Sequence, residues 1–275
     1  MTRPTNSNWS ELLIEAVERP GFILEAYRRF HGYSLGNQVA ALCQCIGRGI
    51  PPGPIGTVRK WNDLGRRVKR GERAISLCMP VTVKERSNGD PESEVPVSFD
   101  PAARTIFLWK PHWFVLAQTE GESTPADTPI PAWDKVRALE VLGMQEVPFT
   151  HSDGNVQGYA RGRTVAVSPL AQLPAKTLFH ELGHILLGHC VTEGVDRVEL
   201  PRTLTEAEAE AVALLCLDAL ELPGAEYARG YIQAWYGRGT ALPDHSAQRI
   251  FRSADKILRA GQAVPVEART LAAAS

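Results

Sequence analysis

The stretch Thr177–His189, which reads T-L-F-H-E-L-G-H-I-L-L-G-H, constrains this chain more than any other part of its sequence. His180 and His184 are four residues apart. On a helix of about 3.6 residues per turn, both imidazoles therefore leave the same face and can hold one metal ion. Glu181 is expected to lie beside the metal, where a general base for a metal-polarised water belongs. The stretch predicts a zinc-binding helix with a catalytic glutamate.

The residues around this motif favour a helix as well. Pro174 suits the first helical turn, where its missing N–H costs nothing, and apolar residues such as Leu178 and Leu182 form a stripe. The alternative is a buried helix whose two histidines only fill the core. It would leave two imidazoles and a carboxylate in an apolar helix without a charge partner, which is costly.

A catalytic zinc site needs a third protein ligand. The helix expected from about 203 to 220 offers Glu206 and Glu210 on one face, among small residues that allow a close approach to the metal helix. We predict Glu206 as the third ligand and Glu210 as a group that orients a histidine. Glu208, on another side, is the alternative ligand, and capping of the helix is the alternative role for these glutamates. His189, past the expected end of the metal helix, is expected to be exposed or to support a ligand.

The composition is that of a folded chain without a membrane segment. Of 275 residues, 44% are hydrophobic and 22% charged, which allows a real core and two compact units. No run approaches the length that crosses a bilayer, and the first ten residues lack a signal-peptide pattern, so we expect a cytoplasmic protein. The five cysteines include no C-x-x-C pair, which argues against a disulfide framework.

Basic residues are concentrated in the stretch 59–73, which holds seven Lys and Arg against two Asp and Glu and also contains Trp61. The net charge of the whole chain is −1, yet residues 1–125 hold 16 Lys and Arg against 13 Asp and Glu. Cations neutralise phosphates and aromatic rings stack on bases, so this pattern indicates a surface for single-stranded nucleic acid. The predicted contact residues are Arg59, Lys60, Trp61, Arg66, Arg67, Lys69 and Arg70. A solvated basic face with tryptophans in the core is the alternative.

The first half is expected to form a small α+β domain with a curved sheet. Helices are predicted at 9–31, with a break at Pro20-Gly21, at 35–45 and in the first part of 57–72. Strands are predicted at 74–83, 95–99, 105–108 and 113–116, with Asn88-Gly89 as a hairpin turn. The polar, proline-rich stretch 120–131 is typical of a linker, so we place the domains at 1–124 and 125–275.

The second half alternates short strands and helices around the metal motif. Helices are predicted at 133–142, 203–220 and within 226–260, and strands at 147–150, 157–159 and 163–167. The strand Arg163–Val167 directly precedes the metal helix. We expect it to be the edge along which an extended substrate binds by strand addition.

Motifs in both halves coincide with those of one family. In the second half they are H-E-L-G-H at 180–184 and E-A-E-A-E-A-V-A at 206–213. In the first half they are Tyr33-Ser34, Asn37, Trp61, Leu64-Gly65-Arg66, Val68-Lys69, Gly71-Glu72 and Ile75. With these features the chain resembles the ArdC-type antirestriction proteins of plasmids and other mobile elements.

The resemblance implies a single-stranded-DNA-binding domain followed by a zincin-like, gluzincin-type metallopeptidase domain with one zinc ion. It also implies protection of incoming DNA from restriction during transfer. In the expected reaction Glu181 takes a proton from a water polarised by zinc, which His180, His184 and Glu206 hold. A protein or peptide would be the substrate. The alternative is a DNA-binding interaction protein whose metal site is structural or vestigial.

Overall fold

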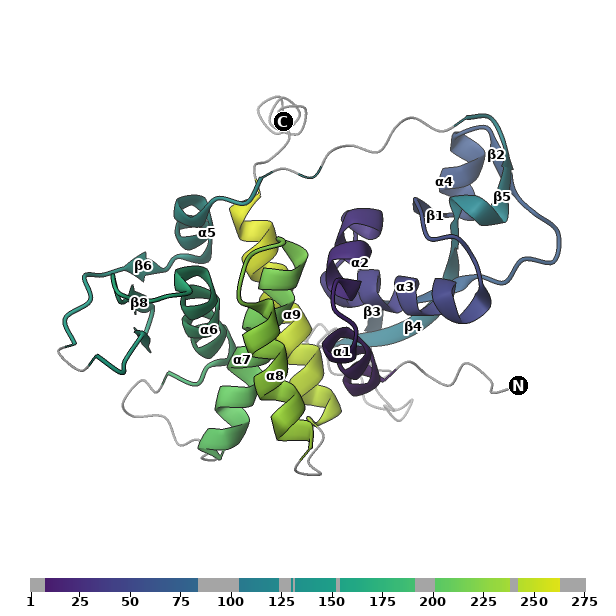
Figure 1. The fold of residues 1–275 in the computed structure, drawn as a ribbon. Helices are drawn as coiled ribbons and strands as arrows, with labels where there is room; N and C mark the ends of the chain where they lie inside the picture. The colour runs from purple at the N-terminus through teal and green to yellow at the C-terminus, as the bar shows by residue number, and fades with distance from the viewer. Residues whose placement is uncertain are drawn as a thin grey trace, which may run out of the picture. The chain divides into compact units, whose positions relative to one another are not determined.

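The computed structural model describes residues 8–83, 104–123, 130, 132–151, 154–190, 201–237 and 242–262. Helices and short strands form two compact units, which confirms the predicted α+β class (Figure 1). The first unit consists of Met1–Asn6 and Ile55–Thr124, and the second of Ser7–Pro54 and Pro125–Ser275. No helix in the described part of the chain has both the length and the apolar character of a membrane span.

The first three helices belong to the second unit, so the prediction of one domain over 1–124 is wrong for residues 7–54. These helices are α1 (Trp9–Glu18), α2 (Phe22–Phe30) and α3 (Leu35–Arg48). The Trp9 ring lies 5.9 Å from the ring of Phe251, and the Leu35 N–H donates to Asp255 at 2.8 Å. The sequence pattern shows which helix faces are apolar, but it does not show which part of the chain covers them.

The first unit is built on a three-stranded antiparallel sheet. β4 (Arg104–Val115) pairs with β1 (Ile55–Thr57) on one side and with β3 (Ile75–Val83) on the other. The pieces predicted at 105–108 and 113–116 are thus one continuous strand. The predicted strand at 95–99 and the turn at Asn88-Gly89 lie outside the described residues.

Two short strands and two short helical segments complete this unit. β2 (Arg66–Val68) pairs with β5 (Thr119–Gly121) in a separate antiparallel ribbon. α4 (Val58–Asp63) precedes β2, and the 3-10 helix η1 (Leu116–Gln118) leads into β5. The sequence predicted the helix in this region but assigned residues 66–68 to a helix and turn.

The second unit is organised around α7 (Arg202–Ala219). Every residue from 207 to 217 is buried, so this helix lies in the core and not at the surface. The helices that pack against it are α2, α6 (Pro174–Leu187), α8 (Ala225–Tyr236) and α9 (Asp244–Gly261) (Figure 1). α5 (Lys135–Leu142) packs on α9.

A small three-stranded sheet lies against α6. Its order is β6 (Gln145–Glu146), β8 (Thr164–Val167) and β7 (Gly158–Arg161). The strand predicted at 147–150 is therefore wrong, because pairing with β8 occurs at 145–146 instead. The predicted edge strand is also wrong: β8 is the middle strand, and β7 is the edge that packs on α6.

Candidate metal centre

α6 carries the motif on one continuous helix, as the histidine spacing predicts. It begins with Pro174 and ends at Gly188, whose φ of 74° provides a left-handed cap. Leu178 and Leu182 are buried on its inner side. A Cβ placed on Gly183 would lie 3.2 Å from Val212 of α7, so the glycine permits the close approach of the two helices.

This close approach brings Glu206 of α7 to the two histidines of α6. The Nε2 atoms of His180 and His184 are 3.0 Å apart. The Oε2 atom of Glu206 lies 3.3 Å from Nε2 of His180 and 3.7 Å from Nε2 of His184. Four ligands at about 2.0–2.1 Å from a tetrahedral zinc ion are separated by roughly 3.3–3.4 Å. The donor atoms and their spacing therefore fit one divalent metal ion.

Glu210 contacts the outer nitrogen of His180, which is the role the sequence assigned to it. Nδ1 of His180 lies 2.9 Å from Oε2 of Glu210, and Nζ of Lys176 lies 2.6 Å from Oε1. Burial raises the pKa of Glu210, but the hydrogen bonds with His180 and Lys176 outweigh burial and hold this pKa below its usual range. Glu210 thus remains an anion that orients the His180 ring.

Two successive hydrogen bonds connect His184 with the side chains of His189 and Glu208. Nδ1 of His184 lies 3.0 Å from Nδ1 of His189, and Nε2 of His189 lies 2.8 Å from Oε2 of Glu208. The side chains of His189 and Glu208 are only 6% and 1% exposed. His189 therefore supports a metal-ligand candidate and is not exposed. Glu208 therefore contacts His189 and does not belong to the cluster that Glu206 completes.

Electrostatics distinguish the ligand candidates from Glu181. Burial lowers the pKa of His180, but hydrogen bonds with Glu206 and Glu210 outweigh burial and raise it to about 9. The hydrogen bonds with His180 and His184 hold the pKa of Glu206 below its usual range. Burial raises the pKa of Glu181, which suits a group that must take up and release a proton.

A cleft of about 1380 Å³ opens over His180, Glu181, His184 and Glu206. One wall consists of residues 154–160, which include the start of the edge strand β7. A Cβ on Gly158 would lie 2.5 Å from Thr177, so glycine is required where β7 crosses α6. Its lining is mixed, and it includes two exposed apolar side chains, Leu170 at 82% and Tyr227 at 65% exposure. The cleft can accept an extended chain.

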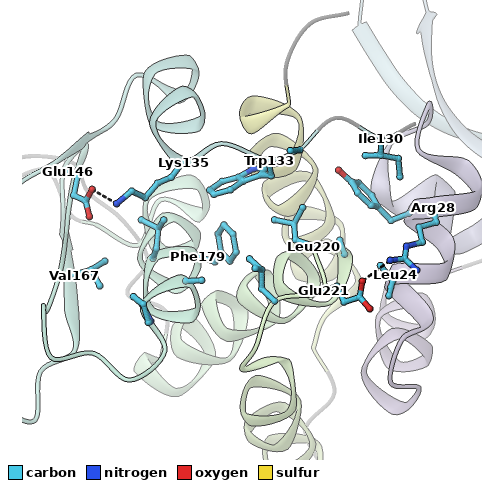
Figure 2. Close-up of a pocket in the computed structure, with 17 residues that line it drawn as sticks. Leu24, Arg28, Ile130, Trp133, Lys135, Glu146, Val167, Phe179, Leu220 and Glu221 are labelled. Atoms are coloured by element: carbon cyan, nitrogen blue, oxygen red, sulfur yellow. Dashed lines mark hydrogen bonds and ion pairs between the residues drawn. The ribbon is translucent and has the colours of Figure 1, made fainter. Parts of the chain in front are cut away.

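A second cavity, of about 750 Å³, lies on the opposite face of α6. Figure 2 shows Trp133 and Phe179 at this cavity. Their ring centroids are 5.1 Å apart. The ion pairs Lys135–Glu146 and Arg28–Glu221 lie at opposite ends of the view (Figure 2). Its described lining is mainly apolar and includes no histidine or cysteine.

The predicted DNA-contact residues divide into two groups. Trp61 is 1% exposed and its Nε1–H donates to the Phe114 carbonyl at 2.9 Å, so it belongs to the core and cannot stack on a base. Arg66 donates to Oγ1 of Thr119 at 2.9 Å and to the Thr119 carbonyl at 3.1 Å, which holds β2 against β5.

The remaining candidates of the basic stretch reach solvent. Lys69 is exposed, although its Nζ donates to the Ala117 carbonyl at 2.9 Å. The other exposed candidates are Arg59, Lys60, Arg67 and Arg70. Phe107 of β4, which is 46% exposed, was not among the predicted contact residues, because a strand pattern alone does not show which apolar side chain keeps exposed surface.

Two solved structures have a similar fold. They are crystal structures of the antirestriction protein ArdC from plasmid R388, one metal-free and one bound to Mn(II). The metal-free structure has a TM-score of 0.50 and 17% identity, over 92% of this chain and 94% of that chain. The Mn(II)-bound structure has a TM-score of 0.50 and 16% identity, over 93% and 96%. No family model and no curated protein match the sequence. The resemblance to ArdC is confirmed at the level of the fold.

Proposed function

We propose that this chain is an antirestriction protein of a mobile element that binds single-stranded DNA and carries a zinc-dependent peptidase site. The convergence of His180, His184 and Glu206, with Glu181 beside them, carries the proposal. The ArdC-like fold over more than nine-tenths of the chain supports the antirestriction role.

Zinc is the ion that this donor set suits best. Two imidazole nitrogens and one carboxylate oxygen are one of the ligand sets found in catalytic zinc sites, which leave a fourth position for water or substrate. Imidazole also binds other first-row metals, and one of the two ArdC structures contains Mn(II). Metal-binding experiments should therefore compare zinc with manganese.

The groups around the cleft would share the work of peptide hydrolysis. When bound, the ion supplies a Lewis acid that polarises water and the substrate carbonyl. Glu181 accepts the proton of the attacking water and passes it to the leaving amine, and its raised pKa suits both steps. The edge of β7 pairs with an extended substrate backbone, and Leu170 and Tyr227 contact an apolar side chain at the rim.

Glu181→Gln tests the peptidase proposal, because it removes the base and leaves all three proposed ligands in place. We expect the variant to bind zinc as the natural chain does and to cleave a mixture of unfolded polypeptides at least about 100-fold more slowly. Glu140→Gln, at an exposed position of α5, is the matched control. A natural chain that binds zinc yet cleaves nothing would support the structural metal site instead, and equal cleavage by the Glu181 variant would exclude the proposed base.

DNA binding has its own test in the exposed cations of the first unit. Affinity for single-stranded DNA should fall with salt, with a slope of about 0.7 per phosphate contact. Replacing Arg67 and Arg70 by Ala should lower this slope by about 1.4, whereas Lys256→Ala on α9 should leave it unchanged. A salt-independent interaction, or equal slopes for all variants, would contradict the proposal.

A further inference from the structure

The pair His189 and Glu208 has no task in the proposed reaction, yet it is among the most deeply buried polar pairs of the second unit. Glu208 lies within the run 207–217, where all other residues except Glu210 are apolar. A buried carboxylate costs several kcal/mol unless a partner compensates it, so an apolar residue would be the simpler choice for the core. Glu208 therefore needs an explanation beyond packing.

The hydrogen-bond pattern provides one. When the Nε2 atom of His184 binds a metal, the remaining proton of its ring must be on Nδ1. That Nδ1–H faces Nδ1 of His189 at 3.0 Å, which must then act as the acceptor. A neutral histidine has one donor and one acceptor nitrogen, so the proton of His189 must be on Nε2. From there it donates to Oε2 of Glu208 at 2.8 Å.

We propose that His189 and Glu208 are a positioning pair that holds His184 in the tautomer and ring orientation in which Nε2 binds the metal. Glu208 fixes the proton of His189, and His189 fixes the proton of His184. The inference rests on the proposed metal centre. It adds to the contact of Glu210 with His180 a second set of supporting contacts, from His189 and Glu208 to His184.

The two histidines of the motif are therefore supported differently. His180 contacts a carboxylate directly, and Lys176 partly neutralises that carboxylate. His184 contacts an uncharged imidazole, and the carboxylate lies one residue further away. Removing Glu208 would free His189 to present an N–H toward the N–H of His184, which would turn one of the two rings away.

The tautomers can be read directly in the unmodified, zinc-loaded chain. Long-range proton–nitrogen NMR spectra of the histidine rings should show His184 protonated on Nδ1 and His189 protonated on Nε2. The opposite tautomer at His189, or a His189 protonated on both nitrogens, would overturn the proposal. This measurement does not depend on the folding of any variant.

Zinc affinity of the full chain, measured by competition with a chromophoric chelator, supplies the second readout. Replacing both His189 and Glu208 by Leu removes the pair without leaving an unpaired buried charge. We expect this variant to bind zinc about 10–100-fold more weakly. His189→Gln keeps one acceptor and one donor and should retain most of the affinity. His245→Leu, at an exposed histidine of α9, is the matched control.

The absorption spectrum of the cobalt-loaded chain separates positioning from simple packing. A positioning role predicts altered visible bands in the double variant and near-normal bands in His189→Gln, because the ligand geometry changes only in the former. A packing role would lower the melting temperature of the metal-free chain and leave bands and affinity unchanged, which would overturn the inference. A natural chain that binds no zinc, cobalt or manganese would instead refute the metal centre and the inference with it.

Discussion

The two faces of α6 show how one helix can combine reactive groups with a stable core. On the cleft side His180 and His184 contact Glu206, and Glu181 lines the same cleft as the edge strand β7. On the opposite side Phe179 packs edge-on against Trp133 in an apolar cavity (Figure 2). The two faces of α6 therefore have different roles: the apolar face fixes the position of the helix, and the cleft face holds the metal. Each prediction below tests whether these two roles can be separated.

The largest effect is expected on the cleft face. His184→Ala should weaken zinc binding by at least about a thousandfold, because binding energies of about 10–16 kcal/mol for structural zinc sites are shared among a few ligands. Isothermal titration or chelator competition measures this loss. The free energy of unfolding of the metal-free chain should change little. A large drop in this free energy would contradict the separation of metal binding from stability between the two faces of α6.

The opposite face should respond in the reverse way. Phe179 is fully buried, so Phe179→Ala should lower the free energy of unfolding of the metal-free chain by about 3–5 kcal/mol. Urea denaturation measures this change. Zinc affinity of the folded protein should change much less than in His184→Ala. Loss of zinc binding without loss of stability would contradict the assigned role.

A substitution between the two faces should affect both properties. The Cβ of Gly183→Ala would lie 3.2–3.3 Å from Val212 and Ala209 of α7, so the helices must separate slightly. Overpacking of this kind costs about 1–3 kcal/mol. Because Glu206 is on α7, zinc affinity should fall together with stability. A variant that loses stability alone would show that the spacing of α6 and α7 does not control the metal site.

The pH dependence of zinc binding provides a smaller effect. In the metal-free chain the pKa of His180 is raised to about 9, so below that pH a metal ion must displace a proton from this ring. The apparent affinity should therefore rise about tenfold per pH unit between pH 7 and 9 and level off above it. Titration at several pH values in low salt measures the slope. An affinity independent of pH would contradict a protonated His180.

The metal cluster was predictable because helix geometry fixes it. The i, i+4 spacing of His180 and His184 places both rings on one face of α6 whatever the rest of the fold, whereas the choice of Glu206 over Glu208 depends on how α7 packs against α6. The role of His189 was only partly predictable, since it follows the helix cap and its direction depends on tertiary packing. The basic stretch was harder, because composition does not reveal that Trp61 fills the core and that Arg66 binds backbone carbonyls.

The fold shows the same contrast between local and long-range information. Helix positions followed from apolar periodicity and from breaks such as Pro20-Gly21. The place of α1–α3 in the second unit and the central position of β8 depend on contacts between distant parts of the chain. A single sequence determines these contacts, but no local pattern in it shows which distant segments will pair.

The most direct test of the metal centre is the metal content of the purified chain and of two glutamate variants after loading with zinc in excess. The account predicts one zinc ion per chain for the natural sequence and for Glu208→Gln, and a clear loss for Glu206→Gln. Loss of the ion from Glu208→Gln with retention in Glu206→Gln would show that Glu208, and not Glu206, is the third ligand. No bound zinc in any of the three proteins would contradict the metal centre itself.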